Sequence, residues 1–252
     1  MDAKLRPGER VDDLQCGGLK IIQNSRFFSF GIDAVLLANF AHVRTEDIVV
    51  DLGTGSGVIP LLLACKTKAS KIYGIEINSD MVDMAKRSVK MNSLDDRIDI
   101  IEGDLKEISC YLDKNSVDVA VSNPPYRKMH SGYISPSNAR AIATYEIKCT
   151  LEDIAESAAF VLKNKGRFYM CQRSARLADS ICAMRANGIE PKRLRMVQPF
   201  VNKKPNIFLI EGVKGAKPFI EVMPTLVIYD EDGNYTDEIY RIYGMEADKH
   251  GR

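Results

Sequence analysis

The stretch DIVVDLGTGSGVIPLLLACKT, residues 47–67, decides the fold. Its first six residues form an apolar run typical of a buried strand, and residues 58–67 predict a helix. Pro60 is compatible with that helix because proline is tolerated in a first helical turn. Between them, residues 53–57 form a glycine-rich turn, where a ligand can approach the backbone and the helix start offers free N–H groups. This order predicts a ligand-binding crossover of an α/β sheet.

The alternation of strands and helices continues towards the C-terminus. We expect further strands at residues 71–77, 98–101, 117–121 and 166–171, and helices at 79–92, 150–163 and 174–187. Two strands without a helix between them, at 192–200 and 206–213, predict an antiparallel hairpin at the edge of the sheet. The expected fold class is therefore α/β, with a mostly parallel seven-stranded sheet, the edge hairpin and helices on both faces.

The length and composition fit one structural domain. The chain has 252 residues, 45% of them hydrophobic and 27% charged. We expect a lead-in at residues 1–45 with an amphipathic helix at 31–41, a core at 46–215, and an appendage at 216–252. The appendage should hold a short strand, an Asp232-Gly233 turn and a short helix that Thr236 could cap.

Charge and cysteine content exclude several classes of protein. Lys and Arg number 35 against 34 Asp and Glu, which is unlike both a histone-like binder and a disordered chain. No apolar run approaches the roughly 18 residues of a membrane span, and the N-terminus lacks the apolar core of a secretory signal. The six cysteines form no C-x-x-C pair. We therefore expect a cytoplasmic protein with reduced thiols, no metal and no membrane contact.

The glycine spacing of the turn distinguishes between two nucleotide ligands. In the dinucleotide fingerprint the third glycine comes three residues after the second, whereas here the pattern is G-x-G-x-G. Asp51 lies two residues before the first glycine, where a carboxylate suits a cationic methionine amino group better than a pyrophosphate. Glu76, at the end of the next strand, can accept both ribose hydroxyls. These features favour S-adenosylmethionine over a dinucleotide.

The turn resembles motif I of class I S-adenosylmethionine-dependent methyltransferases. The resemblance implies their Rossmann-like fold, with the methionine end at the turn, the ribose at Glu76 and the adenine ring near Asp104. The cofactor-binding residues expected on this basis are Asp51, Gly53, Thr54, Gly55, Gly57, Glu76, Ile77, Asp104, Leu105 and Asn123.

The tetrapeptide NPPY, residues 123–126, follows the strand at 117–121. Two prolines end a strand, so Asn123 is fixed at the carboxyl end of the sheet, where open α/β sheets bind ligands. An adenine amine is a poor nucleophile, and the Asn123 side chain with the Pro124 carbonyl could accept hydrogen bonds from both of its N–H groups. Tyr126 could stack on a flipped base. NPPY resembles motif IV of methyltransferases that act on planar amino nitrogens. The expected catalytic residues are Asn123, Pro124, Pro125 and Tyr126.

NPPY occurs in DNA adenine, RNA adenine and release-factor glutamine methyltransferases. The chain has no large domain after the core, as DNA enzymes usually need, and its lead-in is shorter than the N-terminal domain of the release-factor enzymes. The segments LKIIQ (19–23), FFSFGIDAVLLA (27–38), NIFLIEGVKG (206–215) and LVIYDEDGNYTDEIYRIYG (226–244) resemble the bacterial valine-tRNA (adenine-37-N6)-methyltransferase family. That resemblance implies tRNA as the partner and methylation at N6 of the adenine beside the anticodon.

Four other functions stay open at this point. The first is a protein glutamine methyltransferase, and the second is an adenine N6-methyltransferase acting on rRNA or DNA. The third is a non-catalytic RNA-binding module, and the fourth is a dinucleotide oxidoreductase. An RNA partner is supported by the segment 185–204, which carries six cations and one acid, whereas acids dominate from residue 219 onward. The expected RNA contacts are Arg127, Lys128, Arg193, Arg195, Lys203 and Lys204.

Overall fold

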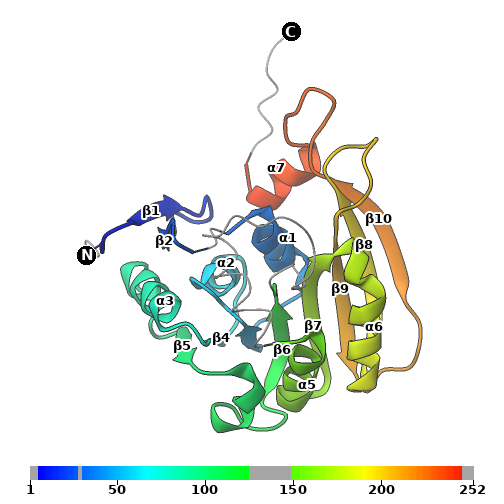
Figure 1. The fold of residues 1–252 in the computed structure, drawn as a ribbon, viewed down its shortest axis with the longest axis horizontal. Coiled ribbons are helices and arrows are strands. Elements are labelled where there is room, and N and C mark those ends of the chain that lie inside the picture. The colour runs from blue at the N-terminus through cyan, green and yellow to red at the C-terminus, as the bar shows by residue number, and fades with distance from the viewer. Residues whose placement is uncertain (1–4, 28–29, 125–148, 246–252) are drawn as a thin grey trace.

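An eight-stranded sheet forms the centre of the molecule in the computed structural model, which describes residues 5–27, 30–124 and 149–245 (Figure 1). Its strands are β3 (Ile48–Leu52), β4 (Lys71–Glu76), β5 (Ile98–Glu102), β6 (Val117–Ser122), β7 (Leu162–Arg173), β8 (Ile189–Gln198), β9 (Ile207–Lys214) and β10 (Glu221–Val227). They lie in the order β10-β8-β9-β7-β6-β3-β4-β5. Strand β9 runs antiparallel to β7 and β8, and the other neighbours pair in parallel. The α/β fold class is confirmed.

Strand β10 is the main difference from the expected sheet. The predicted tail strand began at Leu226, whereas β10 begins at Glu221 and pairs in parallel with β8, so the β8–β9 hairpin is not outermost. The alternation of buried and exposed residues that reveals a strand is absent here, because most of β10 is exposed. Pro224 lies where the register shifts between Met223 and Leu226, as expected for a residue that cannot donate to the ladder.

Helices cover both faces of the sheet. Alternate residues of β3 divide between two buried clusters, Val49 joining the first and Val50 the second, because neighbouring strand residues point to opposite faces. The first cluster includes residues of α1 (Ile32–Phe40), α2 (Val58–Lys66), α3 (Ser79–Met91) and α7 (Asp237–Tyr243). The second includes residues of the 3₁₀ helix η1 (Leu105–Cys110), α5 (Leu151–Val161) and α6 (Leu177–Ala186).

Helix ends follow local chemistry, with two departures from expectation. Thr150 and Asp153 form a reciprocal capping box at the start of α5. The helix expected from residue 174 begins instead with a 3₁₀ turn, η2 (Ser174–Arg176). Thr236 precedes α7 but does not cap it with its side chain, because its hydroxyl donates to the Val227 carbonyl oxygen at 2.8 Å.

The lead-in contains an antiparallel ribbon that the sequence did not reveal, formed by β1 (Glu9–Asp13) and β2 (Lys20–Asn24). The ribbon packs on α3. The Ile22 amide donates to the Ser88 hydroxyl at 2.9 Å, and Ile22 lies in a small apolar cluster with Met81 and Met84. The guanidinium of Arg87 binds both carboxylate oxygens of Glu9, at 2.5 and 2.9 Å. Contacts with α3 therefore hold a ribbon that would be marginal alone.

The described residues show neither a membrane-spanning helix nor a cluster of metal ligands. None of the helices described is both long and apolar enough to cross a membrane. Over the same residues, no group of three or more His, Cys, Asp or Glu side chains is placed to hold a metal ion.

The Arg87–Glu9 pair predicts a measurable stability difference. The side chain of Glu9 is only 3% exposed, and Arg87 lowers the pKa of this carboxyl. Arg87→Ala removes both guanidinium contacts of Glu9, which keeps, among the described residues, only the hydrogen bond from the Arg6 amide at 2.7 Å, and it also breaks the Arg87–Asp83 pair. The free energy of unfolding should therefore fall by about 1–3 kcal/mol in urea titrations. Arg6→Ala is the matched control. It removes only the exposed ion pair with Asp83 and should change stability by about 0–1 kcal/mol. Equal losses in the two variants would contradict this account.

Candidate functional site

Four neighbouring strands bring the predicted segments to one edge of the sheet. Because β6, β3, β4 and β5 are adjacent and parallel, their carboxyl ends meet there. Asn123 follows β6, the turn at 53–57 follows β3, Glu76 ends β4 and Asp104 follows β5. The structure thus places these four sequence-predicted segments side by side, although they are far apart in the chain.

The turn between β3 and α2 requires its glycines. Gly53, Gly55 and Gly57 have φ values of 79°, 58° and 84°, in the left-handed region that favours glycine. A Cβ atom on Gly57 would lie 3.1 Å from the Cβ of Ala85, whereas one on Gly53 would meet no atom within 4 Å. The turn therefore packs against α3 at its helix end and leaves open space beside Gly53, where a ligand could approach the backbone.

Glu76 connects the turn to the start of α3. Its side chain is buried, with one carboxylate oxygen accepting from the Gly55 amide at 2.9 Å and the other from the Asn78 amide at 2.8 Å. Asn78 in turn caps α3 through the amides of Asp80 and Met81. A carboxylate has about four acceptor positions, so Glu76 can hold the turn and still accept hydroxyl groups of a ligand.

Asp51 is the most unusual group at this edge. It is fully buried, and within the described residues neither of its carboxylate oxygens has a hydrogen-bond partner. Burial raises the pKa of Asp51 to about 7. The nearby Thr54 hydroxyl opposes that rise without reaching hydrogen-bond geometry, and the charge of Glu76 adds to it. A buried carboxylate without a partner is unfavourable unless a cation compensates it. The arrangement therefore fits the cationic amino group of the expected cofactor.

The far end of the edge is formed by residues after β4 and β5. Asp104 caps η1 by accepting from the Lys106 amide at 3.0 Å. The carbonyl of Leu105 accepts from the Ser157 hydroxyl at 2.8 Å, which fixes the start of η1 against α5. The Ile77 side chain is 37% exposed and provides apolar surface directly after Glu76. Together these residues offer one polar and one apolar contact, as an adenine ring requires.

The first half of NPPY lies at the end of β6. The Ser122 hydroxyl donates to the Leu52 carbonyl oxygen at 2.8 Å, which links the carboxyl ends of β6 and β3. Asn123 is half-buried and Pro124 is buried. Asn123 therefore follows directly on a strand end that is hydrogen-bonded to the strand carrying Asp51. Four predicted site residues lie outside the described residues, namely Pro125, Tyr126, Arg127 and Lys128.

The predicted RNA contacts on the described residues fall into two groups. Arg193 forms an ion pair with Glu211 and lies over the Phe40 ring at 5.0 Å, and Arg195 pairs with Glu238 at 2.8 Å. These two arginines hold structural elements together, and their contact with RNA stays a prediction. Lys203 and Lys204, in contrast, are exposed in the β8–β9 loop, and no carboxylate of the described residues forms an ion pair with them.

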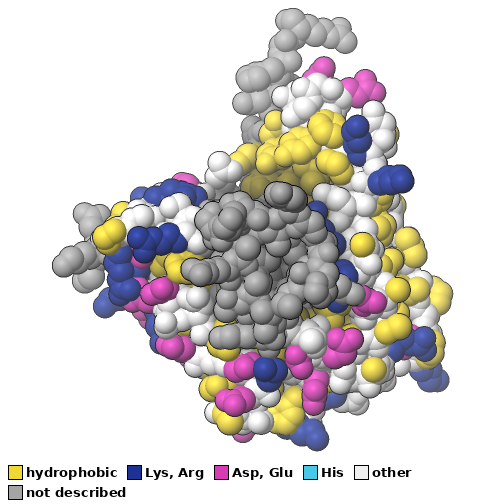
Figure 2. Space-filling view, viewed as in Figure 1, with side chains coloured by type: hydrophobic (Ala, Val, Ile, Leu, Met, Phe, Trp, Pro, Cys, Tyr) yellow, Lys and Arg dark blue, Asp and Glu magenta, His cyan; other side chains and the backbone are white. Residues whose placement is uncertain are grey.

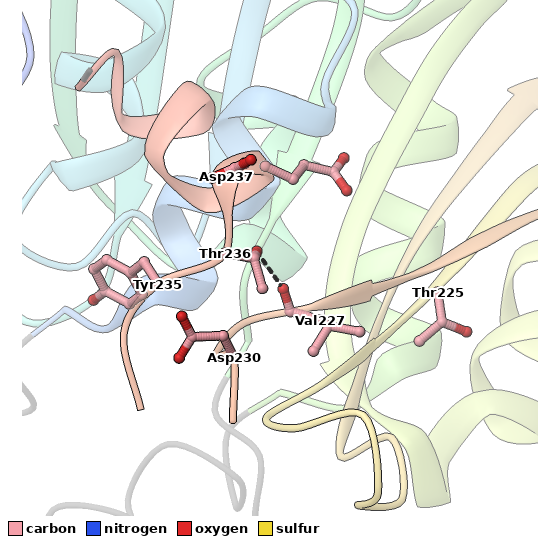
Figure 3. A pocket seen from close by; sticks show the side chains of 7 residues that line it. Thr225, Val227, Asp230, Tyr235, Thr236 and Asp237 are labelled. Atoms are coloured by element: carbon pink, nitrogen blue, oxygen red, sulfur yellow. Dashed lines mark hydrogen bonds between the residues drawn. The ribbon is translucent and has the colours of Figure 1, made fainter. Parts of the chain in front are cut away.

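Sequence reasoning assigned no role to an open depression between β10 and α7 (Figure 3). It lies at the base of the turn that precedes α7, apart from the residues predicted to bind the cofactor. The signal in the sequence is the run of tyrosines on either side of the Asp232-Gly233 turn. Its lining residues are Thr225, Val227, Asp230, Tyr235, Thr236, Asp237 and Glu238.

The environment of Asp51 predicts a pH dependence of stability. Its pKa rises from an ordinary value near 3.8 to about 7, so the folded protein holds a proton that the unfolded chain releases. The protein without cofactor should therefore lose stability as the pH rises from about 4 through 7. Asp51→Asn lacks this titration. Relative to the variant, the wild type should lose on the order of 2–4 kcal/mol between pH 4 and 8, measured by urea unfolding. Parallel pH profiles would contradict the assignment.

Comparison with known proteins agrees with this geometry. A family model described as the methyltransferase small domain matches residues 27–182. Two relatives carry the name tRNA1(Val) (adenine(37)-N6)-methyltransferase. The one from Porphyromonas gingivalis is 29% identical over 84% of this chain and 86% of its own length. The one from Phocaeicola vulgatus is 33% identical over 55% of this chain and 56% of its own.

Solved structures of methyltransferases share this fold. A predicted O-methyltransferase from Agrobacterium tumefaciens superposes with a TM-score of 0.68 at 19% identity, covering 86% of this chain and 100% of that one. At this identity the likeness shows the fold, and the family model carries the assignment. Because that model spans more than half of the sequence, this chain belongs to the methyltransferase small domain family.

Proposed function

We propose that this protein is an S-adenosylmethionine-dependent methyltransferase that modifies N6 of an adenine in tRNA, at position 37 beside the anticodon of valine tRNA. The observation that carries the proposal is the buried carboxylate of Asp51, which has no hydrogen-bond partner among the described residues. It lies at a glycine-rich turn, on the strand that pairs with β6, and Asn123 and Pro124 follow directly after β6. The names of the relatives supply the tRNA and the position. A cytoplasmic location follows from that substrate.

The residues of this edge divide the recognition of the cofactor among them. S-adenosylmethionine supplies an activated methyl group. Asp51 would hold the cationic amino group of its methionine part, and the backbone of the turn would approach the same part closely. Glu76 would accept the ribose hydroxyls, while Ile77, Asp104 and Leu105 would contact the adenine. These roles are supported by the burial and hydrogen bonding of each residue at the carboxyl edge.

Asn123 and Pro124 would orient the target amine. The lone pair of an exocyclic adenine nitrogen is delocalised into the ring, which makes the nitrogen a poor nucleophile. The Asn123 side-chain oxygen and the Pro124 carbonyl would accept its two N–H groups and favour a more pyramidal nitrogen. Because the methyl group is already activated, positioning and preorganised acceptors would supply most of the rate. Pro125 would restrict the backbone, and Tyr126 would stack on the flipped base.

A methyl-transfer assay tests the substrate directly. Labelled S-adenosylmethionine is offered with unmodified total tRNA, rRNA, duplex DNA and a release factor, and the product nucleosides are identified. We expect N6-methyladenosine in the tRNA fraction, with valine tRNA as the acceptor after fractionation. Label in rRNA, DNA or protein with none in tRNA would reject the substrate while keeping the methyltransferase assignment.

The role of Asn123 predicts a specific kinetic defect. Asn123→Ala removes one acceptor that acts on the reacting amine, so kcat should fall about 100-fold or more. KM for tRNA should change little, since the variant keeps the surfaces that bind the rest of the RNA. Asn164→Ala is the matched control, because Asn164 is exposed near the start of β7, at the opposite edge of the sheet. Near-normal turnover of Asn123→Ala would disprove the proposed role.

A further inference from the structure

Four aromatic rings form a continuous stack in the C-terminal part of the molecule. Tyr243 stacks on Tyr235 with ring centres 5.7 Å apart and planes at 17°. Tyr235 stacks on Tyr229 at 5.4 Å and 14°, and Phe200 lies against Tyr229 at 5.4 Å and 34°. Tyr240 meets the edge of this run at 6.0 Å from Tyr235. The rings of Phe200, Tyr229, Tyr235 and Tyr243 are called the aromatic stack below.

The backbone holds the aromatic stack in place. Tyr229 and Tyr235 face each other across an antiparallel bridge. The Thr236 hydroxyl closes the hairpin by donating to the Val227 carbonyl, the contact drawn in Figure 3. The Tyr229 amide donates to the Pro199 carbonyl at 2.8 Å, which ties the hairpin to the loop that carries Phe200. The rings are therefore ordered before any ligand arrives, which lowers the entropy lost on binding.

The two ends of the aromatic stack differ in packing, although all four rings are half-buried. Tyr243, Tyr235 and Tyr229 pack against the first buried cluster of the core. Phe200 is not part of that cluster, and the next residue, Val201, is 73% exposed. Figure 2 shows hydrophobic side chains gathered over α7, with Lys and Arg side chains close beside them. Phe200 is therefore the ring of the stack that lies outside the first buried cluster, beside the exposed Val201.

The Phe200 end of the aromatic stack lies on the same edge of the sheet as Asn123. Strand β7 is parallel to β6, so Arg173 at its end lies on the edge where Asn123 follows β6. Arg173 pairs with Ile207, and Ile207 pairs with Val197 near the end of β8. The β8–β9 loop at 199–206, which contains Phe200, therefore extends from this edge. In the sheet, β7 lies between this hairpin and β6, the strand that Asn123 follows.

Charge separates the two sides of the aromatic stack. On the side of the β8–β9 loop, Lys203 and Lys204 are exposed and form no ion pair with the described residues. On the side of the depression in Figure 3, the lining includes the carboxylates of Asp230 and Asp237. A third acid there, Glu238, is neutralised by Arg195. A polyanion is therefore attracted to the loop and repelled from the depression, which fixes its direction across Phe200.

We propose that the half-buried ring of Phe200, at the loop end of the aromatic stack, receives an unpaired base of the tRNA while Lys203 and Lys204 bind the adjoining phosphates. This inference rests on the proposed function and assigns the substrate surface outside the catalytic pocket. Turning a target adenine towards Asn123 removes a stacking partner from its neighbours in the loop. The Phe200 ring replaces that partner, because every base can stack on an aromatic face.

Three substitutions of Phe200 and one control test the surface by tRNA binding and steady-state kinetics. Phe200→Ala and Phe200→Leu should weaken tRNA binding about tenfold and raise KM, with kcat and cofactor affinity nearly unchanged. Phe200→Leu keeps an apolar side chain and guards against a folding defect. Phe200→Tyr keeps the ring and should bind like the wild type. Phe219→Ala should have no effect, since that ring is 72% exposed but precedes β10, at the opposite edge of the sheet.

Two further measurements separate stacking and charge. The probes are anticodon stem-loops that each lack one base of the loop. The stem-loop that lacks the base stacking on Phe200 should bind the wild type and Phe200→Leu equally. The double variant Lys203→Gln, Lys204→Gln should reduce the slope of log affinity against log salt by about 1–2.

The outcomes distinguish this surface from the proposed function. If the wild type methylates tRNA and Phe200→Leu binds as tightly as Phe219→Ala, the surface is wrong and the activity stands. A wild type that neither binds nor methylates tRNA would overturn both.

Discussion

The carboxyl group of Asp51 is buried at the end of β3, and no described residue compensates it. Burial of this kind raises the free energy of the ionised form, so the group either keeps a proton or meets a cation. The surrounding sheet is stable enough to hold it there because β3 is flanked by β4 and β6 and covered by apolar clusters on both faces. The glycine-rich turn, Glu76 and Asn123 lie at the carboxyl ends of the same group of neighbouring strands as Asp51.

The neighbouring groups show how the position is maintained. Glu76 is equally buried, but two backbone amides satisfy it, and through them it holds the turn against α3. Both carboxylates are buried to the same extent, so they differ in their hydrogen-bond partners and not in their burial. Glu76 is part of the scaffold and keeps acceptor positions for a ligand, whereas Asp51 is left for a ligand to compensate. Under the proposed function, the fold would therefore prepare this site for a cationic ligand before binding.

The cationic side chains of β8 form ion pairs within the fold, whereas those of the β8–β9 loop are exposed. Arg193 and Arg195 lie within β8 and neutralise Glu211 and Glu238, so they stabilise the sheet and its link to α7. Lys203 and Lys204, at the tip of the next loop, are exposed to solvent. In the aromatic stack, Tyr243 packs against the first buried cluster, whereas the equally half-buried Phe200 lies outside it in the β8–β9 loop. Residues of one type thus serve the scaffold when buried and are free to contact a partner only at the surface.

Most of the central sheet was predictable because its strands are buried on both faces or follow a clear alternation with helices. The strands from β3 to β9 overlap the expected strands, although β7 begins at Leu162, inside the helix expected at 150–163. Thr150 was recognisable as the residue that could cap α5. Strand β10 and the β1–β2 ribbon were not predictable in the same way. Strands β1 and β10 are mostly exposed, and β2 is only five residues long although most of it is buried. The β1–β2 ribbon and β10 also depend on contacts with α3 and β8 that are distant in sequence.

The sequence by itself determined the glycine-rich turn, the acids beside it and the NPPY end of β6, because these are local patterns with a fixed place in a strand or turn. Only the tertiary structure decided that, among the described residues, no group bonds to the Asp51 carboxylate while the amides of Gly55 and Asn78 bond to that of Glu76. That outcome depends on which amides and hydroxyls the fold brings to each carboxylate. The same holds for the basic residues and the aromatic stack. Their role depends on burial and on partners in other strands, which spacing along one chain does not encode.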